Sequence, residues 1–189
     1  MCIRDRKEAA RALGLIRWAK AGPALVKAAK AEGELEVKVE MLIAAGGTGD
    51  KKQAPALEAF LADGSESTQL AAAQGLCLLG NKKGFDFAKK KLSSAQSYER
   101  LEGLKLFDGA RAREVSPVLS PLLEDKDRAV AARAARILYE GGDPKMLDWL
   151  VLRSFEALGE AKLPFERELE ELRLQDDQRK AILAKAGIH

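Results

Sequence analysis

The sequence predicts an all-α fold, a right-handed α-solenoid of about five helix pairs followed by a C-terminal helical cap. Three observations predict it: apolar residues recur at helical spacing, the whole pattern repeats at a nearly constant interval, and glycine with aspartate or asparagine separates the two helical stretches of most repeats. Of the 189 residues, 47% are hydrophobic but only 5% are aromatic, so alanine and leucine must fill the core.

A single sequence column aligns the repeats. Its members are 31 or 32 residues apart: Pro23, Pro55, Asp86, Pro117 and Asp148. One apolar helical stretch precedes each of them and a second one contains it, so each repeat is expected to form two helices. A two-helix unit of this size cannot cover both of its apolar stripes alone, so neighbouring pairs must stack. The expected repeats are residues 7–33, 34–64, 65–95, 96–126 and 127–158.

The helices can be placed within each repeat from their apolar spacing. The first helices are expected within 7–20, 34–46, 67–80, 98–110 and 129–141, and the second helices within 21–33, 53–64, 84–94, 115–126 and 146–158. The last repeat illustrates the buried faces. Its expected core positions are Val130, Ala134, Ile137 and Leu138 on the first helix, and Leu147, Leu150, Val151 and Phe155 on the second.

The turns inside the repeats support this division. The stretches GGTGD, LGN and EGGDP place glycine before aspartate or asparagine. Glycine can end the first helix, and aspartate or asparagine can cap the second. Asp143-Pro144 adds a proline at an expected first helical position, where its missing N–H costs nothing. The fourth repeat departs from the pattern, with Ala112 where aspartate is usual, so its turn is the hardest to place.

The pattern changes after residue 158. Residues 159–189 carry charge at high density around a thin apolar stripe formed by Phe165, Leu169, Leu172, Ile182 and Leu183. A solenoid needs a polar-faced cap at its ends, and we expect this segment to be such a cap. Asp176 or Asp177 should start its last helix.

The repeated pattern resembles a known family. The pattern has an apolar residue followed by Ala-Ala and Leu-Gly, and then Gly-Asp-Pro-Lys and Pro-Ala-Leu. It is similar to HEAT repeats of the short bacterial type, which are also found in phycobilin lyase subunits. The closest stretches are AARALG with GPALVKA, TGDKKQAPALEAFL, and DKDRAVAARAARIL with GGDPKMLDWL. The resemblance covers Lys7 to about Leu158. It implies the solenoid fold but no particular function, because such arrays are scaffolds in many unrelated processes.

The first six residues lie outside the pattern. Met1 to Arg6 can be back-translated to the transposon end that is joined to DNA during library preparation for short-read sequencing, so we interpret residues 1–6 as a non-native artefact. The chain would then be the C-terminal fragment of a longer protein. The first repeat would lack a neighbour, and apolar surface is expected at Ala9, Ala12, Leu13 and Ile16.

Few residues suit catalysis or metal binding. The single histidine, His189, is the last residue, so no Ser-His-Asp or Cys-His arrangement can form in a folded core. Cys2 and Cys77 form neither a disulfide framework nor a CxxC pair. Cys77 shares a column with Gly14 and Gly46, which indicates a small buried packing residue. The sequence therefore predicts a protein that is not an enzyme and needs no metal or cofactor.

The placement of charge is more informative than its total. The 32 basic and 29 acidic residues leave a net charge of +3, too balanced to indicate a nucleic-acid partner, and no apolar run approaches the ~18 residues that a membrane span needs. Basic residues nevertheless gather in the turns between first and second helices, which a solenoid places on one edge. This predicted basic edge comprises Lys20, Lys51, Lys52, Lys82, Lys83, Arg113 and Lys145.

Two explanations of the basic edge remain open. The turns between repeats are acidic, with Glu32, Glu34, Glu36, Asp63, Glu66, Glu124, Asp125 and Asp127. Helix electrostatics could explain both signs, because cations favour the C-terminus of each first helix and anions its N-terminus. Alternatively, the paired lysines of adjacent repeats suit an acidic partner that docks along the edge.

The favoured function is accordingly a non-enzymatic scaffold or adaptor that binds a protein of unknown identity. One alternative is a binder of nucleic acid or of another acidic surface. Another is a subunit of a HEAT-like lyase or glycosylase. Base-excising enzymes of HEAT-like fold use tryptophan and aspartate in a cleft, but Trp18 and Trp149 do not share a repeat column and are expected to pack. The pathway, oligomeric state and compartment stay open.

Overall fold

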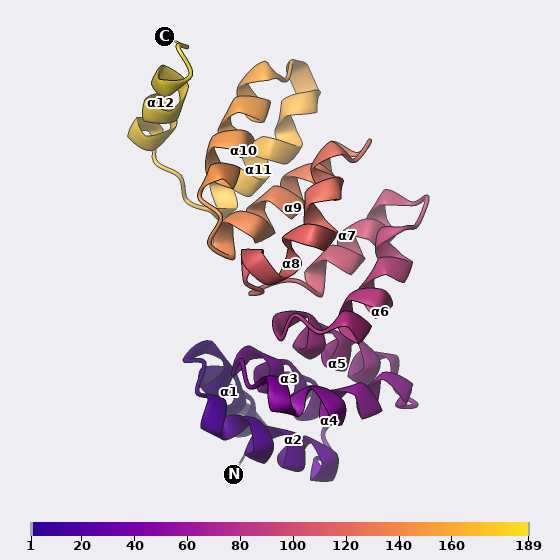
Figure 1. Cartoon of the computed structure of the whole chain (residues 1–189). Coiled ribbons are helices and arrows are strands. Elements are labelled where there is room, and N and C mark those ends of the chain that lie inside the picture. The colour runs from indigo at the N-terminus through magenta and orange to yellow at the C-terminus, as the bar shows by residue number, and fades with distance from the viewer. Residues whose placement is uncertain (1, 189) are drawn as a thin grey trace. The chain divides into compact units, whose positions relative to one another are not determined.

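The computed structural model describes residues 2–188, and Met1 and His189 lie outside this range. The described residues form α-helices and short 3-10 helices, without a strand, so the predicted all-α class is confirmed (Figure 1). The α-helices are α1 Ile3–Leu15, α2 Gly22–Ala31, α3 Leu35–Gly47, α4 Ala54–Glu58, α5 Glu66–Leu78, α6 Lys82–Leu92, α7 Ser97–Lys105, α8 Ala112–Leu119, α9 Arg128–Glu140, α10 Lys145–Glu156, α11 Leu163–Glu171 and α12 Asp176–Lys185. The 3-10 helices are η1 Ala19–Ala21, η2 Lys51–Gln53, η3 Ala59–Ala62, η4 Ser120–Glu124 and η5 Gly159–Lys162.

The chain divides into two compact units, residues 1–110 and 111–189. The division falls inside the fourth predicted repeat, between α7 and α8. This is the turn in which the sequence lacks the usual aspartate, and no side chain caps the start of α8 there. The least regular turn of the sequence is therefore also the boundary between the units.

In the first unit, the first helices of the first three pairs lie side by side. Helix α3 packs against both α1 and α5. The second helix of each pair packs on the first helix of the next pair: α2 on α3, α4 on α5, and α6 on α7. The apolar residues of these faces form one core that includes Leu25, Leu42, Leu57 and Leu76.

Small residues allow the close approach of the first helices. A Cβ atom built on Gly46 would collide with the backbone of Gly75 in the next first helix, and one on Gly14 would lie 2.8 Å from the Cα of Ala44. Cys77, which shares the sequence column of Gly14 and Gly46, is fully buried, as predicted for a small packing residue.

In the second unit, α9 lies at the centre and packs against α8, α10 and α11, while α12 packs against α10. All four predicted core positions of α9 are buried. On α10, Leu150 and Val151 are buried and Leu147 is half-buried. Phe155 was predicted in the core but is 54% exposed. It lies in the last turn of α10, which ends at Glu156, so helical spacing alone extended the buried face one turn too far.

The turn inside each helix pair has one shared backbone feature, a residue with positive φ. The residues concerned are Arg17, Gly49, Gly80, Gly109 and Gly142, and Arg173 in the turn between α11 and α12. Glycine adopts this conformation without strain, whereas arginine does not. The predicted cap thus contains a further helix pair with the same turn. Its last helix begins at Asp176, as expected.

The N-terminal residues join the first helix. Ile3 to Arg6 belong to α1, and Arg6 pairs with Glu32 at 2.9 Å. A helical conformation does not distinguish a native from a non-native segment, so their assignment as an artefact stays a prediction. Ala9, Ala12 and Ile16 are exposed and Leu13 is half-buried, in line with the apolar surface expected on this helix.

Candidate functional site

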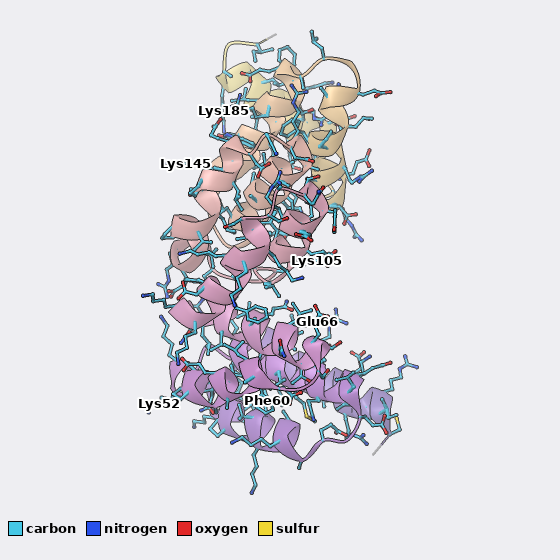
Figure 2. All side chains as sticks on the ribbon, turned by 90° about the vertical axis from the view of Figure 1, so that its right-hand side faces the viewer. Lys52, Phe60, Glu66, Lys105, Lys145 and Lys185 are labelled. Atoms are coloured by element: carbon cyan, nitrogen blue, oxygen red, sulfur yellow. The ribbon has the colours of Figure 1, made fainter. Side chains whose placement is uncertain are left out.

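The seven residues of the predicted basic edge are all exposed. Five of them lie in the first unit, and Arg113 and Lys145 lie in the second. Lys52 and Lys145, which are labelled in Figure 2, project outward from the ribbon. Each of the seven lies at or near the start of the second helical segment of its repeat: η1, η2, α6, α8 or α10.

The turn chemistry places these lysines at fixed positions. The side chain of Asp50 accepts a hydrogen bond from the backbone N–H of Lys52 at 3.1 Å, and Asn81 accepts one from Lys83 at 2.8 Å. Asp143 does the same for Lys145 at 3.1 Å. The predicted capping is thus confirmed for Asp50 at η2 and Asn81 at α6. At α10 the N-cap residue is Pro144 and no side chain caps it, so Pro144 does not occupy the first helical position that was expected for it. Each cap fixes the lysine two residues beyond it, next to a glycine turn that ends the preceding helix.

Helix electrostatics explain these cations poorly. The lysines open the second helices, where the helix dipole is positive and cations are unfavourable by about 0.3–1 kcal/mol each. Among the first helices, only α7 has a basic residue in its last turn, Lys105, and α1, α3, α5 and α9 have none. The residues of the basic edge come after the first helices have ended, so the C-termini of those helices explain them poorly, and the choice between the two explanations stays open.

Neighbouring acids neutralise only part of the basic edge. Lys83 pairs with Glu58 of the preceding repeat at 2.6 Å, and Arg113 lies 3.6 Å from the carboxylate of Glu114. The other members include four lysines whose ammonium groups form no ion pair within residues 2–188, namely Lys20, Lys52, Lys82 and Lys145. Ion pairs at such exposed sites contribute only about 0–1 kcal/mol, so even Lys83 can exchange its partner at little cost.

The acidic residues between repeats have mainly local roles. Asp63, Asp125 and Asp127 each accept a hydrogen bond from a backbone N–H two residues ahead. Glu36 pairs with Lys7 at 2.9 Å, and the hydrogen bond from Lys7 lowers the pKa of Glu36. These acids lie near the starts of first helices, where the helix dipole favours them. Helix electrostatics therefore account for the acidic turns better than for the basic ones.

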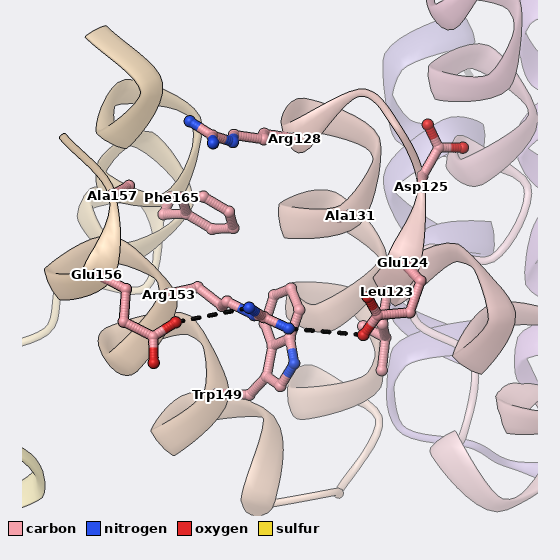
Figure 3. Close-up of a pocket in the computed structure, with 10 residues that line it drawn as sticks. All are labelled: Leu123, Glu124, Asp125, Arg128, Ala131, Trp149, Arg153, Glu156, Ala157 and Phe165. Carbon is pink, nitrogen blue, oxygen red and sulfur yellow. Dashed lines mark hydrogen bonds and ion pairs between the residues drawn. The ribbon is translucent and has the colours of Figure 1, made fainter. Parts of the chain in front are cut away.

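The second unit contains a cavity of about 350 Å³ with an aromatic wall (Figure 3). Trp149 of α10 meets Phe165 of α11 edge-on, with ring centroids 6.0 Å apart. The guanidinium of Arg153 lies 5.4 Å from the Trp149 ring centroid, between Glu124 at 3.6 Å and Glu156 at 3.5 Å. Trp149 thus packs, as predicted, but it also stacks with a cation that two carboxylates neutralise.

A second cavity, of about 390 Å³, lies in the first unit. Residues of α1, α3 and α5 line it, together with Asp108 and Gly109. Arg17 reaches along it and donates a hydrogen bond to the carbonyl oxygen of Gly109 at 3.2 Å. Sequence reasoning missed Arg17, although it stands in a column that holds glycine in the second, third and fifth repeats, at Gly49, Gly80 and Gly142, and this substitution was a readable signal.

No arrangement suited to catalysis is apparent in the described residues. Burial strongly raises the pKa of the Cys77 thiol, which suppresses the reactive thiolate. Among residues 2–188, no three His, Cys, Asp or Glu side chains come close enough to hold a metal ion. None of the helices described is long and apolar enough to cross a membrane. His189, the one histidine considered for catalysis, lies outside the described residues.

Comparison with known proteins adds no assignment, because no protein-family model and no curated protein matches the chain.

Proposed function

We propose that this protein is a HEAT-like α-solenoid scaffold that is not an enzyme and that holds an acidic segment of a partner protein against its basic turns. Three features support the solenoid: the repeated two-helix pattern, the shared positive-φ turn, and the packing of each second helix in the first unit on the next first helix.

The position of the lysines is the observation that carries the proposal. Cations at the starts of helices destabilise the fold slightly, yet lysine or arginine occurs there in every predicted repeat. Lys83 pairs with Glu58 inside the chain, but Lys20, Lys52, Lys82 and Lys145 form no ion pair within residues 2–188. Binding best explains why such cations are kept at positions that cost stability. Exposed lysines without ion pairs suit carboxylates, which a partner can bring without displacing existing contacts.

A protein segment fits this surface better than a nucleic acid does. Nucleic-acid grooves combine dense positive charge with aromatic stacking platforms. Here each capped turn offers only one or two lysines, and the net charge of the whole chain is only +3. The density of positive charge is therefore low for a continuous phosphate backbone.

The test is to replace Lys51, Lys52, Lys82 and Lys83 with glutamate. Binding of a fluorescein-labelled polyglutamate peptide, followed by fluorescence anisotropy at about 50 and 200 mM salt, should weaken at least tenfold and lose most of its salt dependence. Tighter binding of a single-stranded oligonucleotide of the same length would favour the nucleic-acid alternative.

A matched control carries the same change in charge elsewhere. Lys27, Lys30, Lys89 and Lys90 are exposed but lie within α2 and α6 rather than in the turns. Replacing these four with glutamate should leave most of the peptide binding intact. Equal loss in both variants, with circular dichroism showing both folded, would mean that net charge rather than the basic edge binds the peptide, and the proposal would be wrong.

A further inference from the structure

The cavity of the second unit has no role in the proposed function, because none of the seven residues of the basic edge lines it (Figure 3). Its volume of about 350 Å³ lies in the range of pockets that hold small organic molecules. Its aromatic wall consists of Trp149, which is half-buried, and Phe165, which is 4% exposed. The small side chains of Ala131 and Ala157 complete this wall and leave room beside the rings. Such a wall suits a planar apolar ring.

The carboxylates that line the cavity are already engaged within the chain. Glu124 and Glu156 hold the guanidinium of Arg153 between them, at 3.6 Å and 3.5 Å. Asp125 accepts a hydrogen bond from the backbone N–H of Asp127 at 2.8 Å, in the turn before α9. A positively charged ligand would therefore have to displace Arg153 or break this turn before it could gain a carboxylate of its own.

Arg128 is the charged group of the cavity whose guanidinium has no partner within residues 2–188. It is the first residue of α9, and in the view of Figure 3 its side chain extends toward the side on which Phe165 lies. A guanidinium binds a carboxylate through two parallel hydrogen bonds. The charge that the cavity leaves uncompensated is thus positive, and the ligand group that complements it is an anion.

The charges around Arg128 also limit the charge of the ligand. Glu124 and Glu156 lie on the same cavity wall, and each additional negative charge on a ligand would be repelled by them. A carboxylate carries one charge, whereas a phosphate monoester carries up to two at neutral pH. The cavity therefore fits a carboxylate better than a phosphate.

We infer that this cavity binds a small aromatic carboxylate, whose ring lies against Trp149 and Phe165 and whose carboxylate pairs with Arg128. Arg153 stays between its two glutamates and keeps its place 5.4 Å from the Trp149 ring centroid. The inference does not rest on the proposed function, because the site and the basic edge share no residue.

The experiment compares three probes that have the same ring but different charge. They are naphthoate, its neutral amide naphthamide, and the cation naphthylmethylammonium, all substituted at the same ring position. Each is titrated into the full chain at pH 7 and low salt in a calorimeter. We expect saturable binding of one naphthoate per chain, tighter than that of naphthamide by roughly tenfold, and the weakest binding for the cation. In a Trp18→Phe variant, Trp149 is the single tryptophan, and naphthoate should shift its indole N–H signal in NMR spectra.

Variants separate the contribution of the charge from that of the wall. Arg128→Gln should weaken naphthoate binding by roughly tenfold and leave naphthamide binding unchanged. Arg128 is exposed, so the fold should persist, as circular dichroism can verify. Lys126→Gln is the matched control, because it removes an exposed positive charge two residues earlier that does not line the cavity. It should leave the binding of all three probes unchanged.

Two further variants test the location of the site. Ala157→Leu should weaken the binding of naphthoate and naphthamide alike, because its larger side chain fills part of the cavity. The variant in which Lys51, Lys52, Lys82 and Lys83 become glutamate should bind naphthoate as the parent protein does. If that variant loses polyglutamate binding but keeps naphthoate binding, both proposals hold. If polyglutamate never binds while naphthoate does, only the basic-edge proposal fails.

Three results would overturn the inference. The first is the absence of saturable naphthoate binding, or binding no tighter than that of naphthamide. The second is naphthoate binding that Arg128→Gln leaves unchanged. The third is tightest binding of the cation, which would show that Glu124 and Glu156 release Arg153 and that the cavity selects positive charge.

Discussion

Arg17 shows at the scale of one residue how a turn can be locally unfavourable and still be retained. The turns of the next three repeats place Gly49, Gly80 and Gly109 in the positive-φ conformation that Arg17 adopts. A non-glycine residue in the left-handed region costs about 1–2 kcal/mol, and the Arg17 side chain recovers a single exposed hydrogen bond to Gly109.

Arg17→Gly is therefore expected to stabilise the first unit by about 0.5–1 kcal/mol, since relief of the backbone strain exceeds the entropy that glycine adds to the unfolded chain. Gly49→Ala is the matched reverse change. Open space surrounds its Cβ position, so only the backbone conformation opposes alanine, and a loss of about 1 kcal/mol is expected. Urea denaturation measures both. Equal stabilities for Arg17→Gly and the parent protein would show that the turn is not strained.

At the scale of one element, helix α11 contains two glutamates, Glu166 and Glu168, whose side chains lie in contrasting environments. Burial alone would raise the pKa of Glu166, but hydrogen bonds from Ser154 and Arg179 outweigh burial and lower it. Burial raises the pKa of Glu168, and Arg136 only partly offsets this effect. The Arg136 Nε and Glu168 Oε2 atoms are 2.8 Å apart but are not aligned as a hydrogen bond.

The two carboxyl groups should affect stability with opposite pH dependence. Glu166 has a lowered pKa when folded, so its contribution is present at neutral pH and is lost as the pH falls through that value. Glu168 has a raised pKa, so its contribution is present below the ordinary glutamate pKa of 4.5 and is lost as the pH rises through the raised value.

Glu166→Gln should therefore destabilise the second unit at pH 7 by about 1–2 kcal/mol, and Glu168→Gln by clearly less. Denaturation curves of both variants between about pH 4 and pH 7 measure the difference. The difference in free energy of unfolding between the two variants should narrow as the pH falls. A larger loss for Glu168→Gln at pH 7 would show that its ion pair with Arg136 outweighs the cost of burying the charge.

For the whole molecule, the main feature is the division into two compact units, each of which buries a cluster of its own apolar residues. Leu42, Leu57 and Leu76 belong to the core of the first unit, and Leu150, Phe165 and Leu169 to a core in the second. Repeat arrays gain stability from contacts between neighbouring repeats, so a destabilising substitution in one region need not destabilise the rest of the chain. We expect the effect of a substitution in the first unit to end at the irregular turn between α7 and α8.

Gly46→Ala tests this separation. Its new methyl group would collide with the backbone of Gly75, so a loss of about 1–3 kcal/mol is expected for the first unit. Hydrogen exchange should report faster opening of α3 and α5 and unchanged protection of α9 and α10. Gly64→Ala is the control, because nothing lies near its Cβ position. Equal loss of protection in α9 would show that both units unfold as one.

The sequence by itself determined the helical class, the helix pairs and their turns, because apolar spacing and capping residues act within a few residues of one another. Repetition also made glycine or a small residue predictable where first helices meet. Exposure at the ends of helices was not predictable: Phe155 fits the apolar stripe but lies beyond its packing partners.

Only the tertiary structure decided which charges are paired and which surfaces are covered. The capped turns place the lysines at the starts of second helices, and Glu58 reaches Lys83 from the preceding repeat. Nothing in the local sequence distinguishes Lys83, which has a partner, from Lys20, which has none within the described residues. That difference depends on whether a neighbouring helix packs over the turn, because such contacts join residues far apart in the chain.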